Sequence, residues 1–244
     1  MDFARKVGRH HFMQQEPLEE SAPYEDVVAA LLTSERAISE VFFEHIKPEK
    51  PLTYADFFGM GIGRRALALS SGFRVMIEHR NSLCALPIVR MQLDTALRLY
   101  AGFFVTDHQK FCHAVMQGAP IDRMKADDGS VMKDRYLVNR VAKRNPWMTT
   151  VYKLTSGYIH FSDRHIFEAV RKGEGEKAQM AIGPVDFDRK PKHFLEPMRC
   201  VHHLNLIIEF ALKDWYSRMC DPNGVIISAS ELWGEYREHE PDPE

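Results

Sequence analysis

Apolar residues recur three or four positions apart along most of the chain, and polar segments separate these repeats. The first repeat begins at Tyr24 and stops before Pro48 and Pro51. Its apolar members are Val27, Val28, Leu31, Leu32, Ile38, Val41, Phe42 and Ile46. A stripe with this period is typical of an amphipathic α-helix that packs on one side, so the pattern predicts a helix from Tyr24 to about Ile46.

A second helix is predicted from about Tyr54 to His79, and Thr53 stands in position to cap its first turn. The glycines near its start are Gly59, Gly61 and Gly63. Glycine weakens a helix, but it also lets a neighbouring element approach the backbone closely. We therefore expect close helix packing at this end.

The segment from Asn81 to Val105 is apolar over more than half of a helical projection drawn at about 100° per residue. A helix that is apolar on most sides is a buried one, so this segment predicts the central helix of the fold. We place Pro87 in its first turn, where proline is tolerated, and extend the helix past Val105 toward Met116.

Arg90 falls within the apolar arc of the central helix and is the most informative residue of the chain. A buried guanidinium without a partner costs several kcal/mol, so Arg90 must be paired. Asp94, one turn further on, is one candidate partner. Ser156 and His160 of a later helix are others.

Tyr152, Ser156 and His160 lie four positions apart, so they stack on one face of a helix predicted from Trp147 to about Phe161. This face borders apolar positions, and its polar groups can form hydrogen bonds inward to the buried charge of the central helix. Two interpretations are open: a catalytic or binding centre, and a polar network that only fixes the register of the helices. The second arrangement is the commoner one.

A long amphipathic helix is predicted from Phe194 to about Met219. His202, Asn205 and Glu209 share one stripe of it and could complete a central polar site with Arg90. The alternative is that this stripe is the solvated edge of the helix.

A basic helix is predicted at residues 131–144, between the polar loop 121–130 and Asn145-Pro146. Its cations are Lys133, Arg135, Arg140, Lys143 and Arg144. They form a candidate RNA-binding face, although a charge-rich helix face is more often simply solvated.

The period changes in residues 165–183, where two β-compatible runs flank Gly173-Glu174-Gly175-Glu176 and predict a β-hairpin. The predicted fold class is therefore all-α, a helical bundle with a small appended β-hairpin. We expect one domain at residues 24–220, an irregular N-terminal arm at 1–23 and a peripheral C-terminal tail at 221–244.

The composition favours a globular protein, because 45% of the 244 residues are hydrophobic. The formal net charge of −2 leaves no overall basic excess, so a nucleic-acid contact would need a local patch. The cysteines lie far apart without a CxxC pair, which favours reduced thiols and a cytoplasmic location. We find neither a signal-peptide pattern nor an apolar run near the ~20 residues of a membrane span, so no membrane partner is expected.

Sequence motifs exclude several classes of enzyme. The chain has no GxSxG and no GxxxxGK[ST], and its glycine run at residues 59–63 follows no predicted strand. No carboxylate precedes a histidine at the Glu-x-x-His spacing, and His108, Cys112 and His113 could bind zinc only by accident of fold. Neither a metal nor a cofactor is expected.

Arg74 and His79 could carry chemistry near the end of the second helix. A histidine can act as general base or acid at the 2′-hydroxyl of RNA, and an arginine can stabilise the charge that develops. Such a pair suffices in principle for metal-independent RNA cleavage. The same spacing recurs at Arg5 and His10, so the pattern is common in this chain.

Residues 60–165 resemble the uncharacterised helical proteins placed near abortive-infection and HEPN-type domains, in which a helix of the type lvRsllEa precedes a Y-x-x-L-S-x-x-x-H element. The matching positions are Arg90, Asp94, Tyr152, Leu154, Ser156 and His160. Asp94 stands where Glu is usual, and Leu154 is shifted by one. The resemblance implies a helical bundle that homodimerises and acts on RNA in phage defence or toxin–antitoxin systems. HEPN ribonucleases carry their Arg-x4–6-His near the start of a late helix, whereas Arg74 and His79 precede the central helix.

Two functions are therefore considered. The first is an RNA-interacting, HEPN-like protein, and as a metal-independent ribonuclease its candidate catalytic residues are Arg90, His160, Arg74 and His79. The second is a non-enzymatic helical interaction protein with a buried structural network that contains Arg90, Asp94, Ser156 and His160.

Overall fold

The computed structural model describes residues 22–47, 49, 51–173, 175, 177–186, 190–220 and 227, and the structural statements below refer to these residues. Of the predicted N-terminal arm they include only residues 22 and 23, and of the predicted tail only residue 227. The pair formed by Arg5 and His10 lies outside the described residues.

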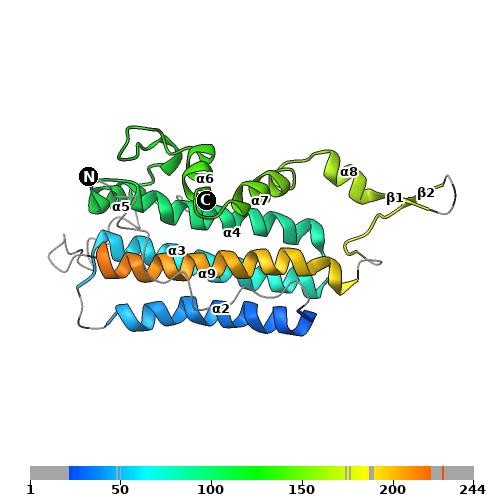
Figure 1. Ribbon diagram of the computed structural model, residues 1–244, viewed down its shortest axis with the longest axis horizontal. Helices are drawn as coiled ribbons and strands as arrows, with labels where there is room; N and C mark the ends of the chain where they lie inside the picture. The colour runs from blue at the N-terminus through cyan, green and yellow to red at the C-terminus, as the bar shows by residue number, and fades with distance from the viewer. Residues whose placement is uncertain are drawn as a thin grey trace, which may run out of the picture.

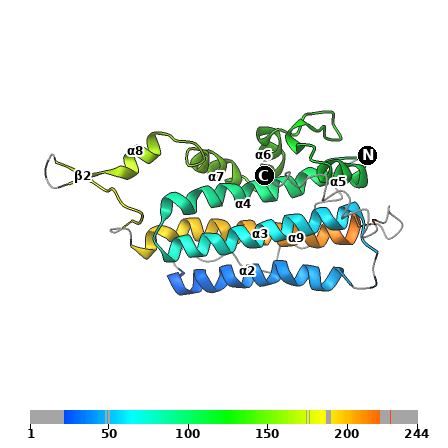
Figure 2. The same ribbon diagram turned by 180° about the vertical axis from the view of Figure 1, so that it is seen from behind.

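The fold is an all-α helical bundle, as predicted. Its long helices are α2 (Tyr24–His45), α3 (Tyr54–Glu78), α4 (Ser82–Phe103) and α9 (Leu195–Arg218). In Figures 1 and 2, α2 forms one side of the bundle, α3 and α9 lie in the middle, and α4 forms the opposite side. None of the helices in the described ranges combines the length and the apolar character that crossing a membrane requires.

Shorter helices cover the outer side of α4. They are α5 (His108–Met116), the 3₁₀ turn η1 (Ile121–Arg123), α6 (Asp134–Ala142) and α7 (Trp147–Ser156). Beyond α7, a short helix and a hairpin extend away from one end of the bundle (Figure 1). A second 3₁₀ turn, η2 (Pro191–Phe194), then leads into α9.

Trp215 of α9 joins the core of the bundle to two other helices. It is fully buried, and its ring centroid lies 5.2 Å from that of Phe58 in α3 and 5.3 Å from that of Phe103 in α4. Its indole Nε1 donates a hydrogen bond of 2.8 Å to the carbonyl oxygen of Ala55. The polar atom of this large apolar side chain is therefore satisfied inside the core.

The glycines at the start of α3 permit the close packing that was expected. A Cβ atom at Gly63 would lie 2.1 Å from Phe42 Cζ, and one at Gly59 would lie 2.7 Å from the Tyr216 hydroxyl oxygen. Gly61 faces open space. Two of the three glycines thus let aromatic side chains of α2 and α9 rest directly on the backbone of α3. The predicted Thr53 cap is also present, since its side chain accepts a hydrogen bond from the Asp56 amide.

The central helix is shorter and starts earlier than predicted. The Asn81 side chain caps α4 by accepting a hydrogen bond of 3.0 Å from the Cys84 amide, so the first turn precedes Pro87. The helix also ends at Phe103 instead of continuing to Met116. Asp107 accepts a hydrogen bond of 2.9 Å from the Lys110 amide and thereby starts α5 as a separate helix.

The predicted β-hairpin is confirmed, but the segment before it is helical. Strands β1 (Val170–Lys172) and β2 (Ala178–Met180) pair in antiparallel register. Helix α7 ends at Ser156, earlier than the predicted end near Phe161. Ser162 then caps α8 (Asp163–Ala169), of which residues 165–169 belong to the segment predicted as a hairpin.

Candidate functional site

Arg90 is half of an ion pair that joins the central helix to the basic helix. Its side chain is 11% exposed, and its Nη2 donates a hydrogen bond of 2.7 Å to Asp134 Oδ2 in the first turn of α6. The guanidinium carbon lies 4.4 Å from the centroid of the Tyr152 ring. Arg90 is paired and nearly buried, as predicted. Its partner is Asp134, so the prediction of Asp94 as the partner is wrong.

Asp94 instead serves two other arginines. It accepts hydrogen bonds from Arg98, at 2.9 Å, and from Arg65 of α3, at 3.1 Å. Arg98 also donates to Asp134, so it bridges the two carboxylates. The result is an ion network in which three arginines share two aspartates across α3, α4 and α6. Its charges are largely satisfied within the network.

Ser156 and His160 do not stack with Tyr152 as a set of three. The Ser156 hydroxyl donates to the backbone carbonyl oxygen of Tyr152 inside α7. His160 lies beyond the end of α7, in the turn before α8, and its side chain is exposed. The expectation that these side chains bind the Arg90 charge is therefore wrong, and only the Tyr152 ring lies against it.

Asn205 is fully buried, and it binds Gln92 of α4 instead of Arg90. Gln92 Nε2 donates a hydrogen bond of 2.6 Å to Asn205 Oδ1. Asn205 Nδ2 donates to the hydroxyl oxygens of Ser70 in α3, at 2.9 Å, and Ser34 in α2, at 3.1 Å. One side chain of α9 thus connects all the long helices of the bundle.

The same chain of hydrogen bonds continues to Arg74. The Ser70 hydroxyl donates a bond of 2.7 Å to Glu35 Oε1, and Arg74 binds the two oxygens of Glu35 at 2.9 Å and 3.1 Å. Arg74 is therefore a bidentate partner of a carboxylate within the bundle. His79, the other half of the candidate catalytic pair, is exposed at the C-terminal end of α3.

His202 and Glu209 do not complete a site with Arg90 either. His202 is buried, and burial followed by repulsion from His203 lowers its pKa to about 4, although a hydrogen bond with the Ala30 backbone opposes this shift. Glu209 is buried and forms a 2.7 Å ion pair with Lys213 one turn further on. The predicted stripe is thus an inner face of α9, not a solvated edge.

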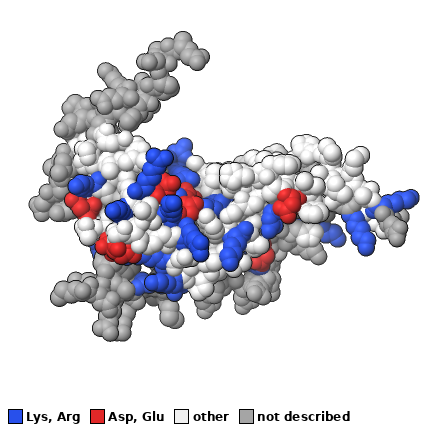
Figure 3. Space-filling view, turned by 90° about the horizontal axis from the view of Figure 1, so that it is seen from above, with Lys and Arg blue, Asp and Glu red and all other residues white. Residues whose placement is uncertain are grey.

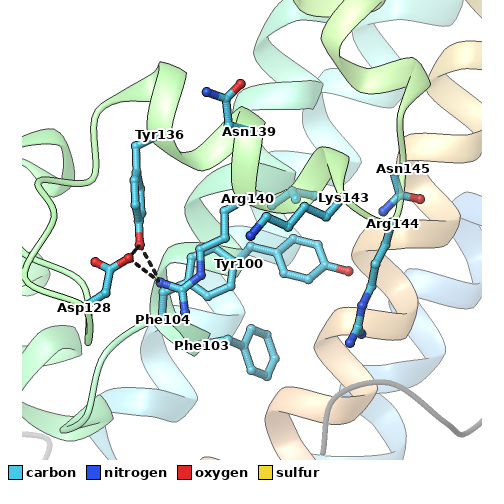
Figure 4. Close-up of a pocket in the computed structure, with 11 residues that line it drawn as sticks. Tyr100, Phe103, Phe104, Asp128, Tyr136, Asn139, Arg140, Lys143, Arg144 and Asn145 are labelled. Atoms are coloured by element: carbon cyan, nitrogen blue, oxygen red, sulfur yellow. Dashed lines mark hydrogen bonds and ion pairs between the residues drawn. The ribbon is translucent and has the colours of Figure 1, made fainter. Parts of the chain in front are cut away.

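The predicted basic helix is shorter than residues 131–144, since α6 spans Asp134–Ala142 and leaves Lys133, Lys143 and Arg144 outside it. A pocket of about 420 Å³ lies between α6 and α4. The aromatic side chains of Tyr100, Phe103 and Phe104, at the C-terminal end of α4, provide apolar surface in it. Figure 4 shows Arg140 extending from α6 toward Phe104, with Asp128 and Tyr136 on one side of the pocket. Arg144 lies on the opposite side of the view.

Arg140 is held in a fixed orientation within this pocket. Its guanidinium carbon lies 4.0 Å from the centroid of the Phe104 ring. Its nitrogens donate hydrogen bonds of 2.7 Å and 3.0 Å to the two oxygens of Asp127 and a third to the Tyr136 hydroxyl. Burial disfavours the charge on Arg140, but the hydrogen bonds to Asp127 and Tyr136 outweigh it and raise the pKa.

The acidic and phenolic groups around Arg140 have defined protonation states near neutral pH. Hydrogen bonds from the Ser130 amide and the Tyr136 hydroxyl lower the pKa of the Asp128 carboxyl. Burial, followed by the hydrogen bond to Asp128, raises the pKa of Tyr136. Burial also raises the pKa of Tyr100 to about 12, although the charge of Arg144 opposes this shift. The tyrosines therefore keep their hydroxyl protons and can donate hydrogen bonds.

Two further cations line this pocket. Lys143 and Arg144 are exposed residues of its lining, whereas Lys133 and Arg135 are exposed at the other end of α6 and do not line it. On the face of the molecule seen in Figure 3, Lys and Arg side chains spread around smaller groups of Asp and Glu. The pocket thus combines an aromatic surface with cations that are open to solvent.

The cations of this pocket were predicted from the sequence, but its aromatic surface and its acidic partners were not. Tyr100 and Phe104 belong to the apolar arc of the central helix, where they are indistinguishable from core residues. Asp127 and Asp128 belong to a polar loop. Tyr100 and Phe104 are four positions apart at the end of the central helix, and this spacing was the available signal. The spacing of apolar residues does not predict that α6 packs over this pair.

The described residues contain no group of three His, Cys, Asp or Glu side chains that could hold a metal ion. The histidine and cysteine cluster noted in the sequence is part of the packing of α5. His108 Nδ1 lies 2.8 Å from the Gly102 carbonyl oxygen, and burial raises the pKa of the Cys112 thiol. The His113 ring packs 4.5 Å from that of Tyr54.

Comparison with known proteins gives no relative for this chain. No family model, no curated protein and no solved structure matches it. The pocket between α4 and α6 is therefore a candidate functional site on the strength of its own geometry.

Proposed function

We propose that this protein binds single-stranded RNA at the pocket between α4 and α6. The observation that carries the proposal is the pair of exposed cations, Lys143 and Arg144, beside the partly exposed aromatic side chains of Tyr100 and Phe104. Lysine and arginine bind phosphates, and aromatic side chains stack on unpaired bases. The pocket offers both kinds of group within the space of one or two nucleotides.

Arg140 shapes the wall of the pocket and does not itself bind phosphate. Asp127 and Phe104 hold its guanidinium, so the phosphate contacts fall to Lys143 and Arg144. The Tyr100 hydroxyl and the Asn139 side chain add hydrogen-bonding groups that could contact a base or a ribose. The resemblance to HEPN-type proteins favours RNA over DNA.

Binding is better supported than cleavage. Arg74 is held by Glu35 and Arg90 by Asp134, so neither guanidinium is presented to a substrate phosphate. His79 and His160 are exposed, but they lie outside the pocket lining. We therefore propose an RNA-binding protein, and metal-independent cleavage is a separate hypothesis with its own test.

The test measures the affinity for a fluorescently labelled 12-nucleotide oligouridine by anisotropy at low and moderate salt. We expect K143E/R144E to weaken binding at least about tenfold and to reduce the salt dependence, because phosphate contacts release counterions. The matched control is R36E/K47E, which changes the charge equally at exposed positions on and just after α2, across the bundle. Equal losses in both double variants, or no binding by the wild type, would overturn the proposal.

A second candidate function, protein interaction, is favoured by the segment formed by α8 and the hairpin. This segment extends away from the bundle (Figure 2), and it exposes large apolar side chains. Phe161 is 83% exposed, and Phe167, Met180 and Ile182 are also exposed. An isolated two-stranded hairpin is marginal in water, and exposed apolar groups of this size mark interaction surfaces.

We propose that a second copy of the chain covers this segment, which agrees with the homodimer that the family resemblance implies. Light scattering coupled to size-exclusion chromatography tests the proposal. We expect F167D to shift a dimer toward the monomer, whereas F43D, at an equally exposed phenylalanine of α2, should not. A wild-type monomer at all concentrations would contradict it.

A further inference from the structure

A second and larger pocket is a groove of about 1030 Å³ bounded by α4, α7 and α9. Its apolar wall includes Trp147, Val151, Leu154, Leu206 and Phe210. Leu154 is more than half exposed, and Leu206 and Phe210 are partly exposed. The groove therefore presents an apolar surface that the described residues leave open.

Charged residues gather at one end of this groove. Arg199, which is only 8% exposed, donates a hydrogen bond of 2.7 Å to Glu196, whose side chain is 81% exposed. Arg164 lines the same groove, with its guanidinium carbon 5.5 Å from the centroid of the Tyr158 ring. Arg199 also donates to the Ala22 carbonyl oxygen at 3.5 Å. Both arginines and the carboxylate of Glu196 thus line this end of the groove.

The order of residues along α9 separates the charged end from the apolar one. Glu196 and Arg199 lie in the first two turns, while Leu206 and Phe210 lie two to three turns further on. At about 1.5 Å per residue, Arg199 and Phe210 are roughly 16 Å apart along the helix axis. The groove is therefore long, apolar along most of its length and cationic at one end.

We infer that this groove binds a free single-chain amphiphile with an anionic head group, such as a long-chain carboxylate. The hydrocarbon chain lies along Leu206, Leu154 and Trp147. The head group lies near Arg199 and Arg164, where it shares or replaces the interaction with Glu196. Apolar pockets with a few polar groups at one place are typical of small-molecule sites.

Some polar groups along the groove are already satisfied or neutral. The Thr155 hydroxyl donates to the Val151 carbonyl oxygen of its own helix. Burial raises the pKa of the Cys200 thiol to about 12, so this group stays neutral. The remaining polar lining includes Asn145, Thr150 and His203. The choice of a lipid-like chain over a protein helix therefore rests on the charges at one end of the groove and the apolar length beyond them.

The test is calorimetric titration of the full-length protein with hexadecanoate below its micelle concentration, beside uncharged hexadecanol. We expect hexadecanoate to bind, R164Q/R199Q to weaken it at least about tenfold, and the affinity for hexadecanol to change little. L154D should abolish binding of both ligands. L32D, at a similarly exposed leucine of α2, is the matched control. Melting curves show which variants fold, and R164Q alone replaces the double variant if that one does not.

Three outcomes would overturn the inference. They are no hexadecanoate binding by the wild type, equal losses in L154D and L32D, and binding only to anionic phospholipid vesicles or to an amphipathic peptide. The inference is independent of RNA binding. L154D should leave oligouridine affinity unchanged, so failure of one proposal does not imply failure of the other.

Discussion

Arg90 and Asp134 form an ion pair between the middle of α4 and the first turn of α6, with 2.7 Å between Nη2 and Oδ2. Asp134 also accepts a hydrogen bond from Arg98, so one carboxylate forms ion pairs with two arginines of the central helix. The pair fixes α6 on α4, and α6 carries Arg140 and leads directly into Lys143 and Arg144, the exposed cations of the proposed RNA site. Arg90 therefore helps to position the helix next to that site, but it is not part of the site.

Replacing Asp134 with Asn should destabilise the protein by about 2 kcal/mol, because Arg90 and Arg98 would lose a largely shielded counter-charge. Urea unfolding measures the loss. D122N, at an exposed aspartate of η1, is the control and should change the free energy of unfolding by less than about 0.5 kcal/mol. Equal stabilities of D134N and the wild type would mean that the pair contributes nothing to the fold.

Replacing Asn205 with Ala should be more damaging, with a loss of about 3 kcal/mol, because the variant leaves buried polar groups of three other helices without their partner. These groups are Gln92, Ser70 and Ser34. N139A, at an exposed asparagine of α6, provides the comparison in the same unfolding experiment. A loss no larger than that of N139A would show that water replaces the amide without cost.

The long helices could be predicted because each buries a stripe that repeats along the chain. The start of α3 could also be predicted from its Thr53 cap, but other helix ends that depend on one side chain were not predicted. Asp107 divides the predicted extension of the central helix, and Ser162 starts α8, which takes in the first residues of a β-compatible run. A capping residue changes the backbone path through one or two hydrogen bonds, and the spacing of the apolar residues does not reveal it.

The candidate site was predicted only in part, for a related reason. Burial of Arg90 follows from its own helix, but its partner is 44 residues away. Sequence spacing favours the neighbour one turn on, and Asp94 is instead shared by Arg65 and Arg98. Likewise, Arg140 was recognisable as a cation, but the Phe104 ring beneath it follows only from the packing of α6 on α4.

The buried His202 predicts a pH dependence of stability. Its pKa is about 4 in the folded protein against 6.5 for the ordinary group, so between these values the unfolded chain binds more protons than the folded one. The free energy of unfolding should therefore fall by up to about 3 kcal/mol as the pH drops from 6.5 toward 4. Above pH 6.5 this contribution is fully present.

Urea unfolding of the wild type and of H202Q at pH 5 and pH 7.5 tests this prediction. We expect the loss of stability at the lower pH to be clearly smaller in H202Q. H79Q, which removes an exposed histidine, should retain the wild-type dependence. An identical pH dependence in H202Q and the wild type would show that another group titrates in this range, and His203, whose pKa burial also lowers, would be the next to test.

RNA cleavage provides the decisive comparison between the two functions suggested by the sequence. His79 and His160 are exposed, so H79A and H160A should each alter the free energy of unfolding by less than about 0.5 kcal/mol. Because Arg74 and Arg90 are engaged by carboxylates, we expect the wild type and both variants to bind oligouridine equally and to leave it intact in the presence of EDTA. The measurement is gel analysis of labelled RNA beside the anisotropy titration. Cleavage by the wild type that is lost in one variant of unchanged stability would instead identify a metal-independent ribonuclease and its catalytic histidine.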